Sequence, residues 1–231
     1  MKAPRHVAII LDGNRRYSEK SKLKWWQGHE KGAKKVEELF FWCKEIGIKE
    51  VTLYTFSLEN FKRSKKELDF LMGLFVKEFN KLKKDNRIHE DRIRIKFIGR
   101  IYLFPENVQK AINELEESTS SYDDYKVNFA MGYSGRAEIV DAVKKIAKKV
   151  GEGKVMVKDI DEGLVSKNMY LNSEPDLLIR PGGEFRISNF LIWESSYTEF
   201  WFTEKLWPEF TKEDLKKAVE DYKKRQRRFG I

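Results

Sequence analysis

The stretch HVAIILDGNRR, residues 6–16, is the part of the sequence that says most about the fold. Its apolar run is short and bounded by turn residues, which is typical of a buried strand. The run stops at Asp12, and in an α/β sheet ligands bind at the carboxyl ends of the strands. Asp12 would therefore meet a metal or a substrate, while the neighbouring arginines favour an anionic ligand. One structural alternative stays open here, in which Asp12 or Asn14 only caps the next helix.

The composition is that of a folded globular chain and sets its size. The 231 residues are 41% hydrophobic and 36% charged, and we expect them to form one domain over residues 1–231. The formal net charge of +9 favours an anionic partner, which could be a nucleic acid, a phosphorylated ligand or an acidic membrane surface. The charge alone does not decide between these three classes.

Localisation is predicted from what the sequence lacks. Cys43 is the single cysteine and lies in an apolar run, so we expect a buried thiol in a reducing compartment. We find no uninterrupted apolar segment long enough to span a bilayer and no signal-peptide pattern at the N-terminus. We therefore expect a cytoplasmic protein, with contact to a membrane only at its periphery.

Strand and helix patterns alternate along the chain. The strands are predicted at residues 6–11, 50–56, 93–98, 126–131, 176–179 and 197–203. The helices are predicted at residues 28–46, 65–86, 105–118 and 137–150, with a basic terminal helix behind Thr211. Residues 17–24 are polar and rich in lysine, and residues 151–172 are expected to be irregular or weakly helical. The alternation predicts an α/β fold with a single, largely parallel central sheet of about six strands, surrounded by helices.

Polar clusters follow several of the predicted strands and should converge on one edge of the sheet. They contain one acid among arginines, hydroxyls and amides: Asp12, Asn14, Arg15, Arg16, Ser57, Asn60, Arg63, Arg136, Arg180, Arg186 and Ser188. Arginines bind phosphate oxygens in bidentate fashion, and a lone carboxylate suits Mg²⁺ shared with substrate phosphates. These residues predict a site for a phosphorylated or diphosphorylated ligand with Mg²⁺.

The predicted helix 65–86 carries apolar side chains on more than one face. Such a helix is either buried in the core or packs on the core with one side and lines a cavity with the other. If it lines a cavity beside the phosphate site, the substrate would have a diphosphate head and a hydrocarbon tail. The pattern of apolar residues leaves both interpretations open.

Several motifs together resemble one enzyme family, the cis-prenyltransferases related to undecaprenyl diphosphate synthase. The matching segments cover the chain in order: residues 6–16, 52–61, 176–184, 186–191, 207–208 and 228–230. The resemblance implies transfer of prenyl groups by condensation of isopentenyl diphosphate onto an allylic diphosphate. It also implies a Mg²⁺ cofactor, a homodimer and a hydrophobic tunnel, whose wall would include the helix behind Glu67.

The product implied by the resemblance is a polycis-polyprenyl diphosphate, the precursor of a glycosyl carrier lipid. The primer would be geranylgeranyl or farnesyl diphosphate. The alternatives are a cis-prenyl diphosphate synthase with a shorter product or, in a different class, a basic nucleic-acid-binding protein. The basic residues are spread along helices and form no basic stripe, so we expect no nucleic-acid partner.

The resemblance also implies a role for each matching residue. The implied catalytic residues are Asp12 and Asn60, and the implied metal-associated acids are Asp12 and Glu199. Those implied for the allylic diphosphate are Gly13, Asn14, Arg15, Arg16, His29, Ser57 and Arg63. Those implied for isopentenyl diphosphate are Arg180, Arg186, Ser188, Glu67, Arg228 and Gly230, and Arg228 would reach across the homodimer.

The chain departs from the bacterial pattern of the family at a few positions. Trp25 stands where an arginine toward the allylic diphosphate is common, so Lys22 or Lys24 would contribute instead. The Arg15-Arg16 pair and Pro181 resemble archaeal or eukaryotic members. This favours geranylgeranyl diphosphate as the primer.

Overall fold

The computed structural model describes residues 3–225, which contain one six-stranded sheet with every neighbouring pair parallel. The strands are β1 His6–Ile10, β2 Glu50–Ser57, β3 Ile93–Ile98, β4 Tyr125–Tyr133, β5 Leu177–Pro181 and β6 Glu199–Thr203. Their order across the sheet is β3-β4-β2-β1-β5-β6. The predicted α/β fold with about six strands is confirmed.

The helices mostly lie where the apolar periodicity predicts them. They are α1 Asn14–Lys20, α2 Trp25–Ile46, α3 Lys65–Lys83, α4 Asn86–Glu90, α5 Glu106–Thr119, α6 Gly135–Gly151, α7 Glu162–Asn168 and α8 Lys212–Lys224. Short 3₁₀ turns are η1 Leu58–Lys62, η2 Ile101–Leu103, η3 Val157–Asp159 and η4 Trp207–Glu209. Helix α3 ends earlier than predicted because the Asp85 side chain caps a new helix, α4. Within residues 3–225, no helix combines the length and the apolar character needed to cross a membrane.

The first half of the polar segment 17–24 belongs to α1. Helix α2 begins before its predicted start, because Gly28 lies inside the helix where α1 packs against it. A Cβ on Gly28 would lie 2.0 Å from the backbone oxygen of Asn14, so glycine is required for this close approach. Helix α1 has no apolar periodicity of its own, so its contact with α2 stabilises it.

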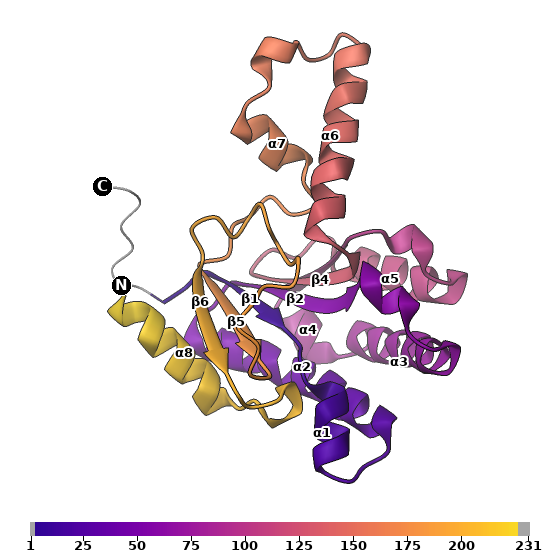
Figure 1. The fold of residues 1–231 in the computed structure, drawn as a ribbon, viewed down its shortest axis with the longest axis vertical. Helices are drawn as coiled ribbons and strands as arrows, with labels where there is room; N and C mark the ends of the chain where they lie inside the picture. The colour runs from indigo at the N-terminus through magenta and orange to yellow at the C-terminus, as the bar shows by residue number, and fades with distance from the viewer. Residues whose placement is uncertain (1–2, 226–231) are drawn as a thin grey trace.

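The two faces of the sheet are covered differently (Figure 1). Helices α2, α3, α5 and α8 pack on one face and form the larger core with strand residues such as Ile9 and Leu53. Cys43 is buried in this core, where burial raises the pKa of its thiol, as expected for a thiol that is not a nucleophile. A smaller apolar cluster on the other face includes residues from the segments 170–171 and 187–191.

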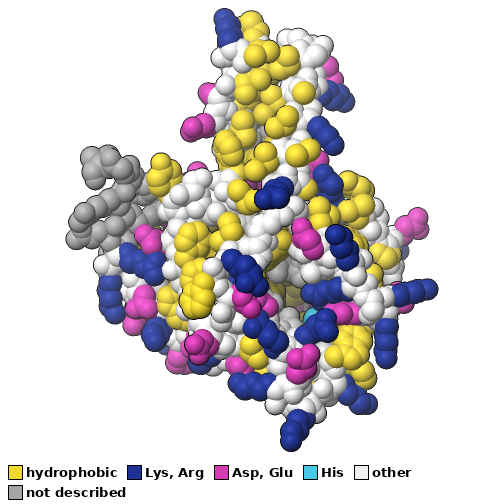
Figure 2. All heavy atoms as spheres, viewed as in Figure 1, with side chains coloured by type: hydrophobic (Ala, Val, Ile, Leu, Met, Phe, Trp, Pro, Cys, Tyr) yellow, Lys and Arg dark blue, Asp and Glu magenta, His cyan; other side chains and the backbone are white. Residues whose placement is uncertain are grey.

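Helices α6 and α7 form an arm that projects from the sheet (Figure 1). Most of the segment 151–172 belongs to this arm and contains η3 and α7, in agreement with the prediction of weak helix. Apolar side chains gather along the arm in Figure 2. Those most exposed there include Val140, Val143, Met156, Val157 and Ile160, each more than 40% accessible. The arm therefore presents an apolar surface to its surroundings.

The position of the site follows from the strand order. Strand β1 lies between β2 and β5. The strands that follow β1 in the chain, β2 to β4, extend the sheet on one side of it, and β5 and β6 extend the sheet on the other side, so the strand order reverses at β1. Ligands bind in the crevice that such a reversal of strand order leaves at the carboxyl ends. Asp12 follows β1 and Arg180 lies near the end of β5, so both face this crevice.

Candidate active site

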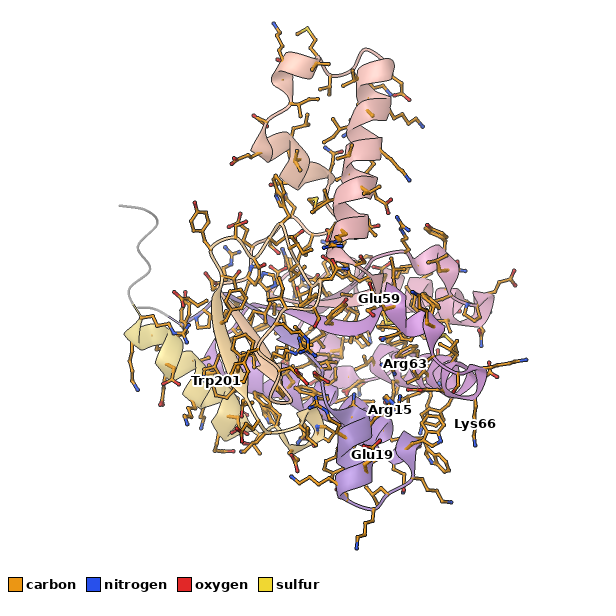
Figure 3. The ribbon with its side chains drawn as sticks, in the orientation of Figure 1. Arg15, Glu19, Glu59, Arg63, Lys66 and Trp201 are labelled. Carbon is orange, nitrogen blue, oxygen red and sulfur yellow. The ribbon has the colours of Figure 1, made fainter. Side chains whose placement is uncertain are left out.

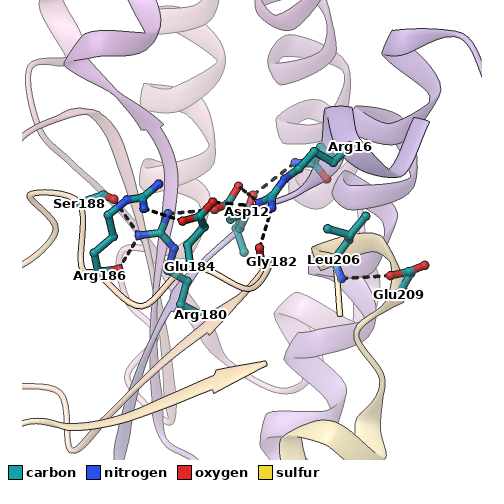
Figure 4. A network of polar contacts seen from close by, with 11 residues as sticks. Asp12, Arg16, Arg180, Gly182, Glu184, Arg186, Ser188, Leu206 and Glu209 are labelled. Atoms are coloured by element: carbon teal, nitrogen blue, oxygen red, sulfur yellow. Dashed lines mark hydrogen bonds and ion pairs between the residues drawn. The ribbon is translucent and has the colours of Figure 1, made fainter. Parts of the chain in front are cut away.

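Asp12 lies between two guanidinium groups at the crevice (Figure 4). Its Oδ2 accepts a hydrogen bond from Nη2 of Arg180 at 2.9 Å, and its Oδ1 lies 3.0 Å from Nη2 of Arg16. Nη1 of Arg16 also donates to the carbonyl oxygen of Gly182 at 2.6 Å. Gly182 has a φ of +102°, and a Cβ there would lie 2.7 Å from Nη2 of Arg16, so glycine gives this guanidinium its space.

The loop after β5 brings together the predicted second cluster. The Arg180 side chain is only 5% exposed, and its Nη1 donates to Oγ of Ser188 at 2.7 Å and to the carbonyl oxygen of Arg186. A buried cation requires such partners, because removing it from water is costly. The Arg186 side chain is 61% exposed and forms an ion pair with Glu184. Arg186 is therefore free to turn toward an anionic ligand, while Arg180 is fixed.

Glu67 is the centre of a separate group of charges near the starts of α1 and α3. Arg63 donates to Oε1 of Glu67 at 2.8 Å, and Nη1 of Arg15 lies 3.7 Å from Oε2. Arg15 and Arg63 approach each other from different elements in Figure 3. Glu67 therefore lies with residues predicted for the allylic diphosphate. The structure does not bring it together with Arg180, Arg186 and Ser188, the group to which the sequence assigned it.

His29 is a buried neutral imidazole facing the cavity. Burial and then the charge of Arg63 lower the pKa of His29 to about 4, against the opposing effect of Glu67. Its Nε2 has no hydrogen-bond partner among residues 3–225, since Oε1 of Glu67 is 3.6 Å away. A buried polar atom without a partner is costly, and a bound ligand would satisfy it.

Ser57 and Asn60 lie at the turn that follows β2. Oδ1 of Asn60 accepts a hydrogen bond from the backbone N–H of Ser57 at 3.0 Å, which closes a capping box at the start of η1. Both residues line the cavity together with Arg63. The predicted convergence of the β1 and β2 ends is therefore present.

A cavity of about 570 Å³ opens at this edge of the sheet and extends between α2, α3 and the strands. Its polar lining includes Asp12, Asn14, His29, Ser57, Asn60, Arg63 and Ser188. Its apolar lining includes Ala33, Val36, Phe56, Leu71, Leu74, Phe75, Phe79, Leu82 and Phe129. Both interpretations of α3 hold, since Leu71, Phe75, Phe79 and Leu82 belong to the core as well. Such a space accommodates a molecule with an anionic head and a hydrocarbon tail.

Three acids in the cavity lining, Glu37, Glu59 and Glu78, have no place in the sequence prediction. Glu37 on α2 and Glu78 on α3 face each other, and Nζ of Lys81 lies 2.5 Å from Oε1 of Glu37. Burial raises the pKa of Glu78, and the charge of Glu37 adds to this effect. The helical spacing of Glu37 and Glu78 gave no sign of this placement, because each is flanked by charged residues typical of a solvated face.

Asp12 offers a magnesium ion one carboxylate and no complete protein cage. Among the described residues, no group of three or more histidines, cysteines or acids is arranged to hold a metal. Mg²⁺ typically binds proteins through one or two carboxylates and takes its other ligands from water and substrate phosphates. A single acid beside arginines at a cavity mouth fits an ion that is shared with a diphosphate.

Glu199 lies far from Asp12 within this chain. It begins β6 in register with Leu177 of β5, at the amino edge of the sheet, while Asp12 follows the carboxyl end of β1. Its carboxylate pairs with Arg225 at 2.6 Å. The structure therefore does not bring the two predicted metal-associated acids together in one chain.

The remaining predicted contributors are placed as follows. Arg136 is exposed, and its backbone N–H, at the start of α6, donates to Asn189. Lys24 lies over the ring of Trp26, and neither it nor Lys22 lines the cavity. Arg228 and Gly230 lie outside the described residues.

The segment before α8 supports the Asp12 loop, a role that the sequence did not assign to it. The backbone N–H of Trp207 donates to the carbonyl oxygen of Asp12 at 2.9 Å, and its indole donates to that of Gly32 at 2.9 Å. A Cβ on Gly13 would lie 2.9 Å from the Leu206 side chain, which requires glycine in the loop. The only sign of this role in the sequence is that Trp207-Pro208 is one of the segments that resemble the family.

Comparisons with known proteins agree with this site. A family model described as putative undecaprenyl diphosphate synthase matches residues 10–230. A tritrans,polycis-undecaprenyl-diphosphate synthase (geranylgeranyl-diphosphate specific) of Methanocaldococcus jannaschii is 51% identical, over 98% of this chain and 82% of its own length. A protein of the same description from Pyrococcus abyssi is 48% identical, over 98% of this chain and 87% of its own length.

Two solved structures share the whole architecture. Lavandulyl diphosphate synthase from Lavandula x intermedia, in complex with dimethylallyl diphosphate, has a TM-score of 0.95 at 36% identity, covering 99% of both chains. A probable undecaprenyl diphosphate synthase from Campylobacter jejuni has a TM-score of 0.82 at 32% identity, covering 100% of both chains. On these matches, and with a site that joins a cluster of arginines to an apolar cavity, the chain belongs to the undecaprenyl diphosphate synthase family of cis-prenyltransferases.

Proposed function

We propose that this enzyme condenses isopentenyl diphosphate onto geranylgeranyl diphosphate and makes a polycis-polyprenyl diphosphate, the precursor of a glycosyl carrier lipid. The observation that carries the proposal is the cavity, which is polar around Asp12 and apolar along α3. The names of the archaeal relatives, which specify geranylgeranyl diphosphate, support this primer. The Arg15-Arg16 pair and Pro181, which resemble archaeal or eukaryotic members, are consistent with it.

The two clusters of positive charge would divide the two diphosphates between them. Asn14 and Arg63 line the cavity that extends along α3, and Arg15 and Arg16 lie beside it through their ion pairs with Glu67 and Asp12. The allylic substrate would therefore bind there with its tail along α3. Its head would displace the Glu67 carboxylate from the guanidinium groups of Arg15 and Arg63. Isopentenyl diphosphate, with its short chain, would bind at Arg180, Arg186 and Ser188. This division holds the alkene beside the allylic carbon, and such positioning lowers the barrier of a two-substrate reaction.

Negative charge develops on the leaving diphosphate as its bond to the allylic carbon breaks. Arg15, Arg16 and Arg63 would stabilise that charge, and His29 would donate or accept a hydrogen bond as a neutral ring. Asp12 would hold Mg²⁺, which supplies further charge neutralisation to the diphosphate when it is bound. Asn60, fixed by its bond to the Ser57 backbone, would orient the reacting groups.

We also propose that the enzyme is a homodimer formed through the apolar arm. The exposed side chains of Val140, Val143, Met156 and Val157 lie on one projecting element, where a monomer would leave them in water. Two copies related by a two-fold axis would cover this surface with itself. In such a dimer Glu199, Arg228 and Gly230 of one copy would serve the site of the other.

The proposed activity is tested by incubating the enzyme with labelled isopentenyl diphosphate, Mg²⁺ and one primer at a time. The primers are dimethylallyl, geranyl, farnesyl and geranylgeranyl diphosphate, and the products are separated by chain length. We expect the highest kcat/KM with geranylgeranyl diphosphate and a long product. A single condensation, or a preference for dimethylallyl diphosphate, would overturn the proposal in favour of a short-chain synthase.

A further inference from the structure

The loop between β5 and β6 holds Ser188 in an unusual backbone conformation. Ser188, Asn189 and Leu191 have φ values of 48°, 64° and 46°, in the left-handed region that favours glycine. Residues in this region persist only where the surrounding structure fixes them. The loop also carries Arg186. The positions of Arg186 and Ser188, which would bind isopentenyl diphosphate, therefore depend on the contacts that hold this loop.

The first restraint on the loop is Asn189, which binds the start of α6. Its carbonyl oxygen accepts from the N–H of Gly135 at 2.8 Å, and its Oδ1 accepts from the N–H of Arg136 at 3.0 Å. Its Nδ2 donates to Oγ of Ser134 at 2.7 Å. These bonds fix Asn189 and leave Leu191 to a second restraint.

The second restraint runs from Leu191 through Tyr133 to a buried acid. The N–H of Leu191 donates to the hydroxyl of Tyr133 at 3.2 Å, and that hydroxyl donates to Oε2 of Glu138. Oε1 of Glu138 accepts from the N–H of Tyr170 at 2.6 Å and from that of Leu171 at 3.3 Å. Glu138 is completely buried. One carboxyl group therefore joins the loop, the end of β4 and the segment before β5.

A second carboxyl group, that of Glu194, is buried against the first. Glu194 is 3% exposed, and neither of its oxygens accepts a hydrogen bond from an N–H or hydroxyl group of another residue among 3–225. Its carboxyl group interacts with that of Glu138, and two carboxyl groups can share a hydrogen bond only when one of them keeps its proton. The other titratable groups that face the pair are Tyr133 and Glu174, which are neutral or negative.

The electrostatics agree with this geometry. Burial and then the charge of Glu138 raise the pKa of Glu194 to about 8, and Glu174 adds a smaller effect. Burial also raises the pKa of Glu138. The pair therefore holds one proton at neutral pH and loses it in the alkaline range.

We propose that Glu138 and Glu194 share one proton and act as positioning residues, which hold the loop 186–194 so that Ser188 and Arg186 can bind isopentenyl diphosphate. The inference rests on the proposed function for the identity of that ligand. Loss of the proton places two anions side by side in the interior, where they repel. The loop then loosens at Leu191, and the grip on the second diphosphate weakens while the primer site is unaffected.

The first test measures stability and needs no activity. Glu194→Gln keeps the shape of the protonated acid and donates to Glu138 without a dissociable proton. Because the raised pKa makes the folded protein bind more protons than the unfolded chain above pH 4.5, wild-type stability falls as pH rises from 4.5 to 8. We expect Glu194→Gln to melt near the wild-type temperature at pH 5 and at least about 4 °C higher at pH 8.5. Glu174→Gln, which removes an exposed neighbouring acid, is the control and should follow the wild type.

The second test separates the two substrates kinetically. For the wild type we expect the KM for isopentenyl diphosphate to rise at least about fivefold between pH 7 and 9.5, with the KM for the primer constant. In Glu194→Gln both KM values should change less than about twofold over that range. Ionisation of the diphosphates affects both enzymes equally, so a difference between the two enzymes reports on Glu194. Glu194→Leu, which packs but cannot donate, should raise the KM for isopentenyl diphosphate about tenfold at pH 7.

The outcomes of the two tests are distinguishable. Parallel melting curves for the wild type and Glu194→Gln across pH 5–8.5 would overturn the shared proton, whatever the enzyme catalyses. A difference in melting without a difference in the pH profiles of KM, or a parallel rise of both KM values, would overturn the positioning role. Absence of turnover with isopentenyl diphosphate in the wild type would instead reject the proposed function and leave the stability result standing.

Discussion

At the scale of the residue, Asp12 is the position on which the account of the site depends. Its two oxygens contact Arg180 and Arg16, which come from different ends of the chain. The sequence could predict that these residues share an edge of the sheet, because each stands where a predicted strand ends. It could not predict that Arg180 would be buried and Arg186 exposed, since both are arginines in one glycine-rich segment.

We expect Asp12→Ala to lower kcat at least about 100-fold, because the acid that would hold Mg²⁺ at the leaving diphosphate is lost. The fold should survive with a loss of about 1–3 kcal/mol, because the buried Arg180 keeps Ser188 and the Arg186 carbonyl as partners. Steady-state kinetics and thermal unfolding measure the two effects. Asp12→Asn, which keeps the shape, is the matched control for packing, and full activity in either variant would refute the metal assignment.

His29 should make the stability depend on pH below neutrality. Its pKa is about 4 in the folded protein against 6.5 in the unfolded chain, so the unfolded chain binds the proton more tightly. Stability is therefore lost as pH falls from 6.5 to 4, by up to about 3 kcal/mol from this residue. We expect His29→Gln to remove that part of the slope in denaturant titrations. Equal slopes in wild type and His29→Gln would contradict the buried neutral imidazole.

At the scale of the element, the sequence predicts the long helices and all six strands better than it predicts their contacts. Apolar periodicity identifies α3, but it cannot tell which of its side chains face the cavity and which the core. Helix α1 has seven residues and no apolar stripe, so only the possible cap at Asp12 or Asn14 indicated it in the sequence. Gly28 and Gly32 make the contact between α1 and α2 possible, because the absence of a Cβ at both positions lets α2 approach Asn14.

Two glycine substitutions test this packing. Gly28→Ala places a Cβ against the Asn14 backbone, and we expect a loss of roughly 1–3 kcal/mol with a raised KM for the primer. Gly73→Ala is the control, because a Cβ there meets nothing within 4 Å on helix α3. It should gain about 0.5–1 kcal/mol from helix propensity. Urea unfolding gives both values, and a neutral Gly28→Ala would show that the α1–α2 contact is looser than described.

At the scale of the whole molecule, the arm and the sheet have separate tasks. The sheet edge and α3 build the site, while α6 and α7 project an apolar surface away from it (Figure 1). The sequence predicted a homodimer only through the family resemblance, because Val140 and Val143 read as ordinary members of an amphipathic helix. Only the folded arm shows that these residues are left uncovered.

We expect Val143→Lys to dissociate the dimer, because a charge would replace an apolar side chain that is 55% exposed in the monomer. Light scattering coupled to size-exclusion chromatography should give a dimer for the wild type and a monomer for the variant at micromolar concentration. Tyr102→Lys changes an exposed aromatic residue on η2, outside α6 and α7, and should remain dimeric. A wild-type monomer would contradict the proposed assembly.

The central claim is that the diphosphate edge and the α3 cavity form one site, with the growing chain inside the cavity. Leu74 tests it most directly, because it is 8% exposed, lines the cavity and lies outside the core cluster. Leu74→Trp should fill the space, and the measurement is the chain length of products made from geranylgeranyl diphosphate and labelled isopentenyl diphosphate. The account predicts a long product from the wild type and products shorter by several isoprene units from Leu74→Trp, at a similar rate for the first condensation. Products of equal length from the two enzymes would contradict it.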